Sequence, residues 1–313
     1  MQGRVAIVGW MLALASRLPL RLLHAIGALL AYPVRWLGTR EYRVARRNVE
    51  LCFPGLDAAA RQRLLRQTLA EAGKGLCELP RLWAGDPRRA LGLVRAVHGR
   101  EHFDAARAGG RGVLVAAPHL GAWELLNLWL SAQGLLTILY RVPQRAEYEP
   151  LLVRARGALG AEAVRAEPAG VRLLLRRLKE GRIVGILPDQ RPKGGEGIDA
   201  PFFGHPARTM TLVSRLAHRA GVDVVLGFAE RLPRGAGFVL HFVPAEAAVA
   251  GDDLAAGVAA LNRGIEACVR MAPAQYQWTY KRLSFRAPDS GPDPVYGKWK
   301  RSRRRKPADQ DAR

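Results

Sequence analysis

The sequence predicts an α/β protein whose central mixed sheet is covered by helices on both faces. From about residue 93 onward, short apolar runs suited to buried strands alternate with segments of helical periodicity. That alternation is typical of a sheet with helices packed on each side. The chain has 313 residues, of which 49% are hydrophobic and 24% charged, so it can bury a sizeable core. A mainly disordered chain and a polytopic membrane protein are both excluded.

The first part of the chain, residues 1–40, is expected to be helical and associated with a membrane. Residues 5–16 carry no charge, but their length falls short of the roughly 20 residues that a spanning helix needs. A second apolar stretch, residues 22–37, is interrupted by a proline and an arginine. We therefore expect one or two helices lying in, or dipping into, the membrane interface. A buried core hairpin is the alternative, and a cleaved signal peptide is disfavoured because apolar residues continue past Ala15.

The elements that follow can be placed from caps and periodicity. A Pro54-Gly55 pair ends one helix, and Asp57 begins the next. Strands are then expected at residues 113–117, 136–140, 183–187, 222–229 and 238–243, with helices between them at residues 123–131, 148–159, 171–180 and 212–220. This organisation predicts a main domain over residues 41–285. The last residues, 286–313, have the composition of a basic, disordered tail.

The net charge of +22 is concentrated at the two ends of the chain. Residues 1–47 hold eight arginines and one glutamate, and residues 298–306 hold seven basic residues and no acidic one. Basic ends fit an anionic membrane surface or a nucleic acid, since both present dense phosphates. The apolar N-terminal region favours the membrane. Nucleic-acid binding stays a distant alternative, because the sequence contains no recognisable nucleic-acid-binding fold.

The three cysteines are far apart. Cys52, Cys77 and Cys268 match neither a paired metal-binding spacing nor a disulfide framework. Their pattern favours a reducing compartment, and we expect neither a metal nor a cofactor.

The most informative segment runs from a predicted strand through Pro118 and His119 into a helix that contains Glu124. On one continuous helix, a five-residue offset would turn the two side chains about 140° apart. At a strand-to-helix junction they can meet, because Gly121 lets the chain fold back. Open α/β sheets also place their ligands at this edge. The prediction is an imidazole held by the Glu124 carboxylate and acting as a general base.

The nucleophile of this reaction is expected to belong to the substrate. No Ser, Thr or Cys occurs between Val113 and Leu130, and the chain contains no Gly-x-Ser-x-Gly motif. The pattern therefore indicates acyl transfer from an activated ester to a hydroxyl group. Asp189 and Gln190 follow the strand predicted at residues 183–187, so they should open at the same sheet edge as His119. Asp189 could position an arginine or the acceptor there, or it could simply cap a loop.

Several ordered motifs resemble the bacterial lipid A biosynthesis acyltransferases, a family with a His-x4-Glu signature. Besides HLGAWE, they are Arg46-Arg47-Asn48 with Cys52-Phe53-Pro54, GRIVGILPDQ at residues 181–190, Pro201-Phe202-Phe203-Gly204, and Gln275-Tyr276-Gln277-Trp278. The resemblance extends over about residues 20–285. It implies a glycerolipid-acyltransferase fold with an N-terminal membrane anchor, at the cytoplasmic face of a bacterial inner membrane.

The resemblance also implies the substrates. The donor would be an acyl group on acyl carrier protein, and the acceptor a hydroxyl of a phosphorylated glycolipid, the lipid A precursor. Another membrane glycolipid or a lysophospholipid is the alternative acceptor. Arg156 resembles a family arginine near the active centre, where it could stabilise an oxyanion or bind a phosphate. Arg141, just past the strand at residues 136–140, is a weaker candidate of the same kind, and either arginine could equally be a solvated surface residue.

Overall fold

The fold is given by a computed structural model that describes residues 2–192, 197–283, 293, 295 and 296. Its helices are α1 (Gln2–Ala15), α2 (Leu20–Leu29), α3 (Ala31–Trp36), α4 (Arg40–Cys52), α5 (Ala58–Trp83), α6 (Pro87–Leu91), α7 (Arg100–Ala106), α8 (Trp123–Gln133), α9 (Glu149–Arg156), α10 (Pro168–Lys179), α11 (Leu212–Ala220) and α12 (Leu254–Met271). Its strands are β1 (Val94–His98), β2 (Val113–Ala116), β3 (Leu136–Tyr140), β4 (Glu162–Arg165), β5 (Ile183–Ile186), β6 (Ile198–Phe202), β7 (His205–Thr209), β8 (Val224–Arg231) and β9 (Phe238–Pro244). Almost all of the predicted tail, residues 286–313, lies outside the described residues, so its character stays a prediction.

The sheet is mixed, as predicted. Within the described residues it has seven strands in the order β1-β9-β8-β2-β5-β3-β4, and only the β8–β9 pair is antiparallel. The five strands expected from apolar runs are β2, β3, β5, β8 and β9, which confirms them. Strands β6 and β7 form a separate antiparallel hairpin. Because β2, β3, β5 and β8 are parallel, their carboxyl ends open at one edge of the sheet.

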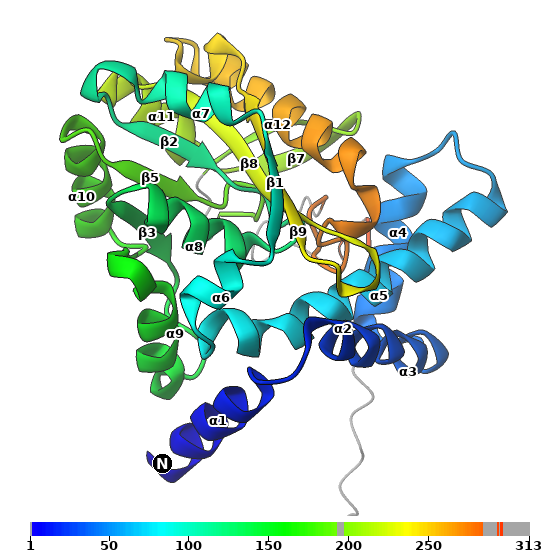
Figure 1. Cartoon of the computed structure of the whole chain (residues 1–313). Helices are drawn as coiled ribbons and strands as arrows, with labels where there is room; N and C mark the ends of the chain where they lie inside the picture. The colour runs from blue at the N-terminus through cyan, green and yellow to red at the C-terminus, as the bar shows by residue number, and fades with distance from the viewer. Residues whose placement is uncertain (1, 193–196, 284–292, 294, 297–313) are drawn as a thin grey trace, which may run out of the picture.

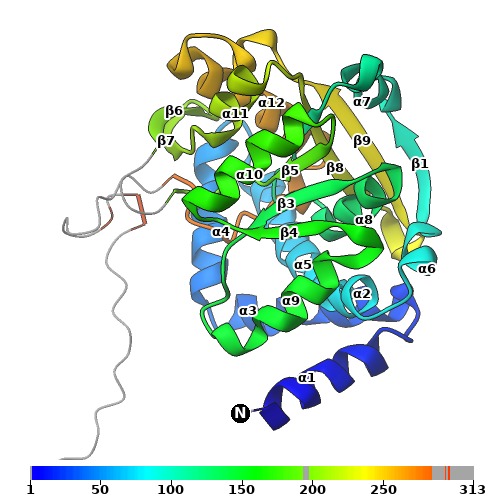
Figure 2. The same cartoon turned by 90° about the vertical axis from the view of Figure 1, so that its left-hand side faces the viewer.

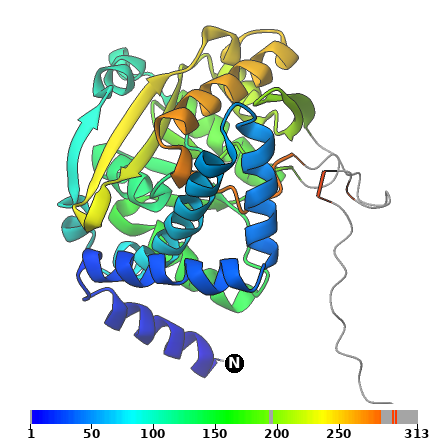
Figure 3. The ribbon, with the colours of Figure 1, turned by 90° about the vertical axis from the view of Figure 1, so that its right-hand side faces the viewer.

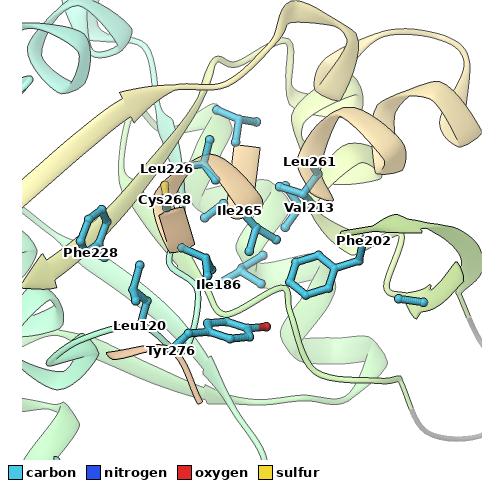
Figure 4. Close-up of a cluster of buried hydrophobic side chains, with 14 of the residues drawn as sticks. Leu120, Ile186, Phe202, Val213, Leu226, Phe228, Leu261, Ile265, Cys268 and Tyr276 are labelled. Carbon is cyan, nitrogen blue, oxygen red and sulfur yellow. The ribbon is translucent and has the colours of Figure 1, made fainter. Parts of the chain in front are cut away.

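Helices cover both faces of this sheet, also as predicted. Successive side chains of a strand point to opposite faces, so Leu114 and Ala116 contribute to one core cluster and Val113 and Val115 to the other. The first cluster packs against α10, α11 and α12, and Figure 4 shows part of it around Ile186, Leu226 and the α12 side chains. The second cluster packs against α6, α7 and α8.

Local capping explains where the helices before the sheet begin. The Asp57 side chain accepts a hydrogen bond from the backbone N–H of Ala60 at 2.6 Å, which confirms the predicted start of α5. Helix α4 ends at Cys52, just before Pro54-Gly55. Helices α4 and α5 are adjacent, and Figure 3 shows both beside the sheet.

The predicted N-terminal helices are present and lie together on one side of the molecule (Figures 1 and 2). Helix α2 buries Leu20, Leu23 and His24 against α5, while Leu22 and Ile26 on the same helix remain exposed. Among the described helices, none is by itself long and apolar enough to cross a bilayer. Helix α1 and the α2–α3 segment reach the length and apolar character needed to cross a bilayer only when they are taken together, and the chain bends by 117° between them.

Candidate active site

The loop between β2 and α8 carries His119, as the sequence predicts. The backbone N–H of Gly121 donates to the carbonyl oxygen of Gln275 at 3.2 Å, and the N–H of Ala122 donates to that of Ala229 at 2.8 Å. Gly121 has a φ of +62°, and a Cβ atom there would lie 1.9 Å from the carbonyl oxygen of Ala229. Only glycine fits this turn, so the chain folds back at Gly121 as expected.

The imidazole of His119 is held by Asp189. Its Nδ1 atom lies 2.7 Å from Oδ1 of Asp189, and the backbone N–H of His119 donates to Oδ2 at 2.9 Å. Strands β2 and β5 are paired with Ala116 opposite Ile186, so the loops that follow them leave the sheet side by side. Asp189 therefore opens at the same sheet edge as His119, as predicted, and binds the imidazole itself.

Gln190 lies on the other ring nitrogen. Its Nε2 atom is 3.1 Å from Nε2 of His119, and the same amide nitrogen donates to Oε1 of Gln277 at 3.1 Å. An amide group donates to a lone pair, so Nε2 of His119 is the acceptor and Nδ1–H donates to Asp189. The hydrogen bonds thus fix the tautomer in which Nε2 is the basic atom.

The Asp189 carboxylate is charged despite being buried. Burial on its own would raise the pKa of Asp189, but its interactions with His119, including the hydrogen bonds from that residue, and the charge of Arg282 hold that pKa below its usual value. Burial, followed by the nearby Asp189 charge, raises the pKa of Tyr276 far above its usual value. Asp189 is therefore an anion at neutral pH beside a tyrosine that keeps its proton.

Glu124 does not hold the imidazole, and this corrects the expected pairing of His119 with Glu124. Its buried carboxylate, in the first turn of α8, accepts hydrogen bonds from Arg156: 2.6 Å from Nη2 to Oε1, and 3.2 and 3.3 Å from Nε. Arg156 is the last residue of α9. Glu124, in the first turn of α8, points toward α9. Both ring nitrogens of His119 instead contact residues of the loop after β5.

Arg156 and Arg141 differ in their surroundings. Arg156 lies against Glu124 with its side chain only 18% exposed, so it is not a solvated surface residue. Arg141 follows the last residue of β3 directly and is exposed. Among the described residues, no hydrogen bond or ion pair joins Arg141 to His119, Asp189 or Glu124.

Sequence reasoning gave no role to the segment Gln275-Tyr276-Gln277. The structure places it against the His119 loop: the backbone N–H of Gln277 donates to the carbonyl oxygen of His119 at 3.0 Å, and Tyr276 forms a β-bridge with Leu120. In the sequence, the only indication that this segment has a role at the site is that it belongs to one of the motifs that resemble the acyltransferase family. As for metals, the described residues contain no group of three or more His, Cys, Asp or Glu side chains that could hold an ion.

The chain is similar in sequence to known acyltransferases. The sequence model of the family "Bacterial lipid A biosynthesis acyltransferase" matches residues 4–284. The chain is 27% identical over 276 residues to a lipid A biosynthesis lauroyltransferase of Escherichia coli (strain K12), covering 87% of this chain and 89% of that protein. It is 27% identical over 275 residues to a palmitoleoyltransferase of the same organism, covering 86% and 87%. It is also 30% identical over 215 residues to a phosphatidylinositol mannoside acyltransferase of Mycobacterium tuberculosis, covering 66% of each chain.

Proposed function

Because the chain belongs to the bacterial lipid A biosynthesis acyltransferase family, we propose that it moves a fatty acyl chain from acyl carrier protein to a hydroxyl group of a lipid A precursor. Residues 41–285 would form its catalytic domain. The observation that carries the proposal is the His119–Asp189 pair, which leaves Nε2 of His119 as a base at the carboxyl edge of the sheet.

The chemical step follows from this tautomer. Nε2 of His119 takes the proton of the acceptor hydroxyl while its oxygen attacks the carbonyl carbon of the donor thioester. The Asp189 carboxylate stabilises the imidazolium that forms. The new C–O bond replaces the C–S bond, and the imidazolium returns its proton to the departing thiolate. No protein nucleophile is needed.

Glu124 and Arg156 act as a second pair. The two Arg156 nitrogens that Glu124 binds fix the direction of the guanidinium, and the partial exposure of this side chain lets a substrate reach it. An oriented guanidinium can stabilise the thioester oxyanion or bind an acceptor phosphate in bidentate fashion. We assign Glu124 the role of positioning Arg156, in place of the direct partnership with His119.

Charge and apolar surface support the proposed partners and location. The net charge of +22 suits an acidic acyl carrier protein, a phosphorylated acceptor and an anionic membrane surface. Large apolar side chains are exposed on the helices that precede α4, among them Trp10, Met11, Leu29 and Trp36. Such a surface fits the membrane interface, and we place the enzyme at the cytoplasmic face of the bacterial inner membrane.

A different membrane glycolipid is the second candidate acceptor. It is favoured by the 30% identity to a phosphatidylinositol mannoside acyltransferase, whose name specifies another glycolipid. Mass spectrometry of lipids from cells that lack the gene separates the two. Loss of one acyl chain from lipid A supports the first candidate, and unchanged lipid A with an altered glycolipid supports the second.

The direct test is an acyl-transfer assay with purified protein, acyl carrier protein loaded with chains of different length, and a tetra-acylated lipid A precursor. We expect transfer by the natural protein and a turnover lower by roughly 100-fold to 10,000-fold for His119→Ala, which is the usual contribution of general acid or base catalysis. Equal rates for the two proteins would show that His119 is not the base. Absence of transfer to any lipid acceptor would refute the proposed function.

A further inference from the structure

A buried group of charges lies beside the His119 loop, outside the pairs already described. Arg231 is the last residue of β8 and only 5% exposed. It meets Glu78 of α5, which is 2% exposed, and Glu78 in turn bonds His24 of α2 at 2.9 Å. The Arg231 Nη1 atom is also 3.6 Å from Oε2 of Glu71. The charges therefore connect helices α2 and α5 to the end of a central strand.

The guanidinium of Arg231 binds a carboxylate and a loop carbonyl at once. Nε lies 2.8 Å from Oε2 of Glu78, Nη2 lies 2.7 Å from Oε1, and the same Nη2 donates to the carbonyl oxygen of Gly121 at 2.8 Å. A Cβ atom on Gly75 would come within 2.9 Å of Nη2, so glycine leaves the space that the guanidinium occupies. Bidentate binding by Glu78 fixes the direction of the third contact, to Gly121.

The backbone of Arg231 holds the same loop from its other side. Its N–H donates to Oε1 of Gln275 at 2.8 Å, and Nε2 of Gln275 donates back to its carbonyl oxygen at 3.0 Å. The carbonyl oxygen of Gln275 accepts the N–H of Gly121. Both polar groups of the Gly121 residue are thus anchored, one to the Arg231 side chain and one to Gln275, only two residues after His119.

Stability alone does not account for a buried ion pair of this kind. Removing two charges from water costs about as much as their attraction returns, so well-packed apolar replacements are often neutral or stabilising. The contact that an apolar residue could not supply is the hydrogen bond to the Gly121 carbonyl.

We propose that Arg231 is a positioning residue that sets the conformation of the His119 loop through the Gly121 carbonyl, with Glu78 fixing the guanidinium. The inference rests on the proposed function, because the loop matters through the base that it carries. His24 extends the connection to α2, whose opposite face exposes Leu22, Ile26 and Leu29. The orientation of the imidazole is thereby tied to the packing of α2, one of the helices that form the proposed membrane surface.

The test separates positioning from stability by removing the charge together with its partner. Arg231→Met leaves the Glu78 charge buried without compensation and should lower both the melting temperature and kcat. Arg231→Met combined with Glu78→Gln removes both charges and keeps a hydrogen-bonding group for His24. We expect the double variant to regain most of the melting temperature, while its kcat stays about 100-fold low with little change in KM. A kcat that recovers along with the melting temperature would overturn the proposal.

A second readout does not depend on activity. Hydrogen–deuterium exchange of the peptide covering residues 117–122 should be faster in the double variant, because the Gly121 peptide loses one anchor. The matched control is Arg263→Met with Glu246→Gln, an exposed pair with Nη2 2.5 Å from Oε2, which should change neither kcat nor exchange in this peptide. Unchanged exchange in the Arg231→Met, Glu78→Gln variant would refute positioning even if acyl transfer were observed. If the natural protein transferred no acyl chain, the proposed function would fail while the exchange test would still decide the role of Arg231.

Discussion

Gln190 occupies the atom of His119 that the proposed reaction uses. Its amide nitrogen lies 3.1 Å from Nε2 and is itself fixed by Gln277. The acceptor hydroxyl must take the place of this amide before it can give up its proton. In the proposed reaction Gln190 would therefore have two effects: it would favour the Nδ1–H tautomer, and it would occupy Nε2 of His119 until the acceptor arrives.

Removing this amide should lower turnover modestly. In Gln190→Leu the imidazole loses the donor that keeps Nε2 unprotonated, and one net hydrogen bond is worth about 1 kcal/mol, so kcat should fall by up to about tenfold. Steady-state acyl transfer measures this. The control is Gln67→Leu on α5, an exposed glutamine, which should leave kcat unchanged. A Gln190→Leu enzyme with higher kcat would mean that the amide only obstructs the base.

The sequence predicts the wrong carboxylate as the partner of His119, whose role as the base stays a prediction. Glu124 was chosen because it lies five residues from His119, whereas Asp189 is 70 residues away and comes into contact only through the β2–β5 pairing. The shared sheet edge of His119 and Asp189 was predictable from the two strands. Which of two nearby carboxylates faces the ring depends on the direction of the α8 first turn, and no local pattern encodes that direction.

At the scale of secondary-structure elements, helices α2 and α5 cross at unusually short range. A Cβ atom on Gly73 of α5 would lie 1.9 Å from the carbonyl oxygen of Gly27 on α2, and one on Gly27 would lie 2.5 Å from that of Gly73. This close approach brings His24 to Glu78. Two glycines at a crossing thus set the distance between α2 and α5.

Substitution of either helix glycine should therefore destabilise the protein. In an uncrowded helix, Gly→Ala is stabilising by about 1 kcal/mol, but at Gly73 the added methyl group meets backbone and overpacking costs about 1–3 kcal/mol. We expect Gly73→Ala to lower the melting temperature measured by thermal unfolding. Gly55→Ala is the matched control, because a Cβ there meets nothing within 4 Å, and it should not lower that temperature. A Gly73→Ala protein as stable as the natural one would contradict the close crossing.

The strands of the seven-stranded sheet that the sequence missed share a physical cause. Strands β1 and β4 lie at the two edges of the sheet, and their residues are only partly buried, so they carry no continuous apolar run. The central strands β2 and β5 are buried throughout and were predicted. Burial on both faces produces the apolar pattern that sequence analysis detects, and an edge strand lacks it.

At the scale of the whole molecule, helices α1, α2 and α3 lie on one side (Figures 1, 2 and 3), and each of them carries exposed large apolar side chains. Part of α2 is core and part is exposed, so its buried face fits the alternative of a core hairpin, while the membrane association of residues 1–40 stays a prediction. The sequence could not divide the two faces, because the partner of the buried face is the distant helix α5, where Glu78 is 54 residues from His24.

The exposed apolar side chains of these helices predict that the protein binds anionic membranes through them. Replacing Trp10 and Trp36 by Glu, at side chains that are 67% and 86% exposed, should weaken binding to anionic vesicles by at least about tenfold, since burying one large apolar side chain is worth about 1.5–3 kcal/mol. Vesicle co-sedimentation measures the change. Leu135→Glu, at an exposed leucine between α8 and β3, is the control and should leave binding unaffected. Equal binding by the tryptophan variant and the control would contradict an interfacial role for these helices.

The central claim is that Asp189, and not Glu124, keeps the proton on Nδ1 of His119 so that Nε2 can act as the base. Nuclear magnetic resonance of the ¹⁵N-labelled His119 ring tests it most directly at neutral pH, in the natural protein and in the Asp189→Asn and Glu124→Gln variants. The account predicts an Nδ1–H tautomer in the natural protein and in Glu124→Gln, and loss of that preference in Asp189→Asn. A preference that survives Asp189→Asn and disappears in Glu124→Gln would contradict it.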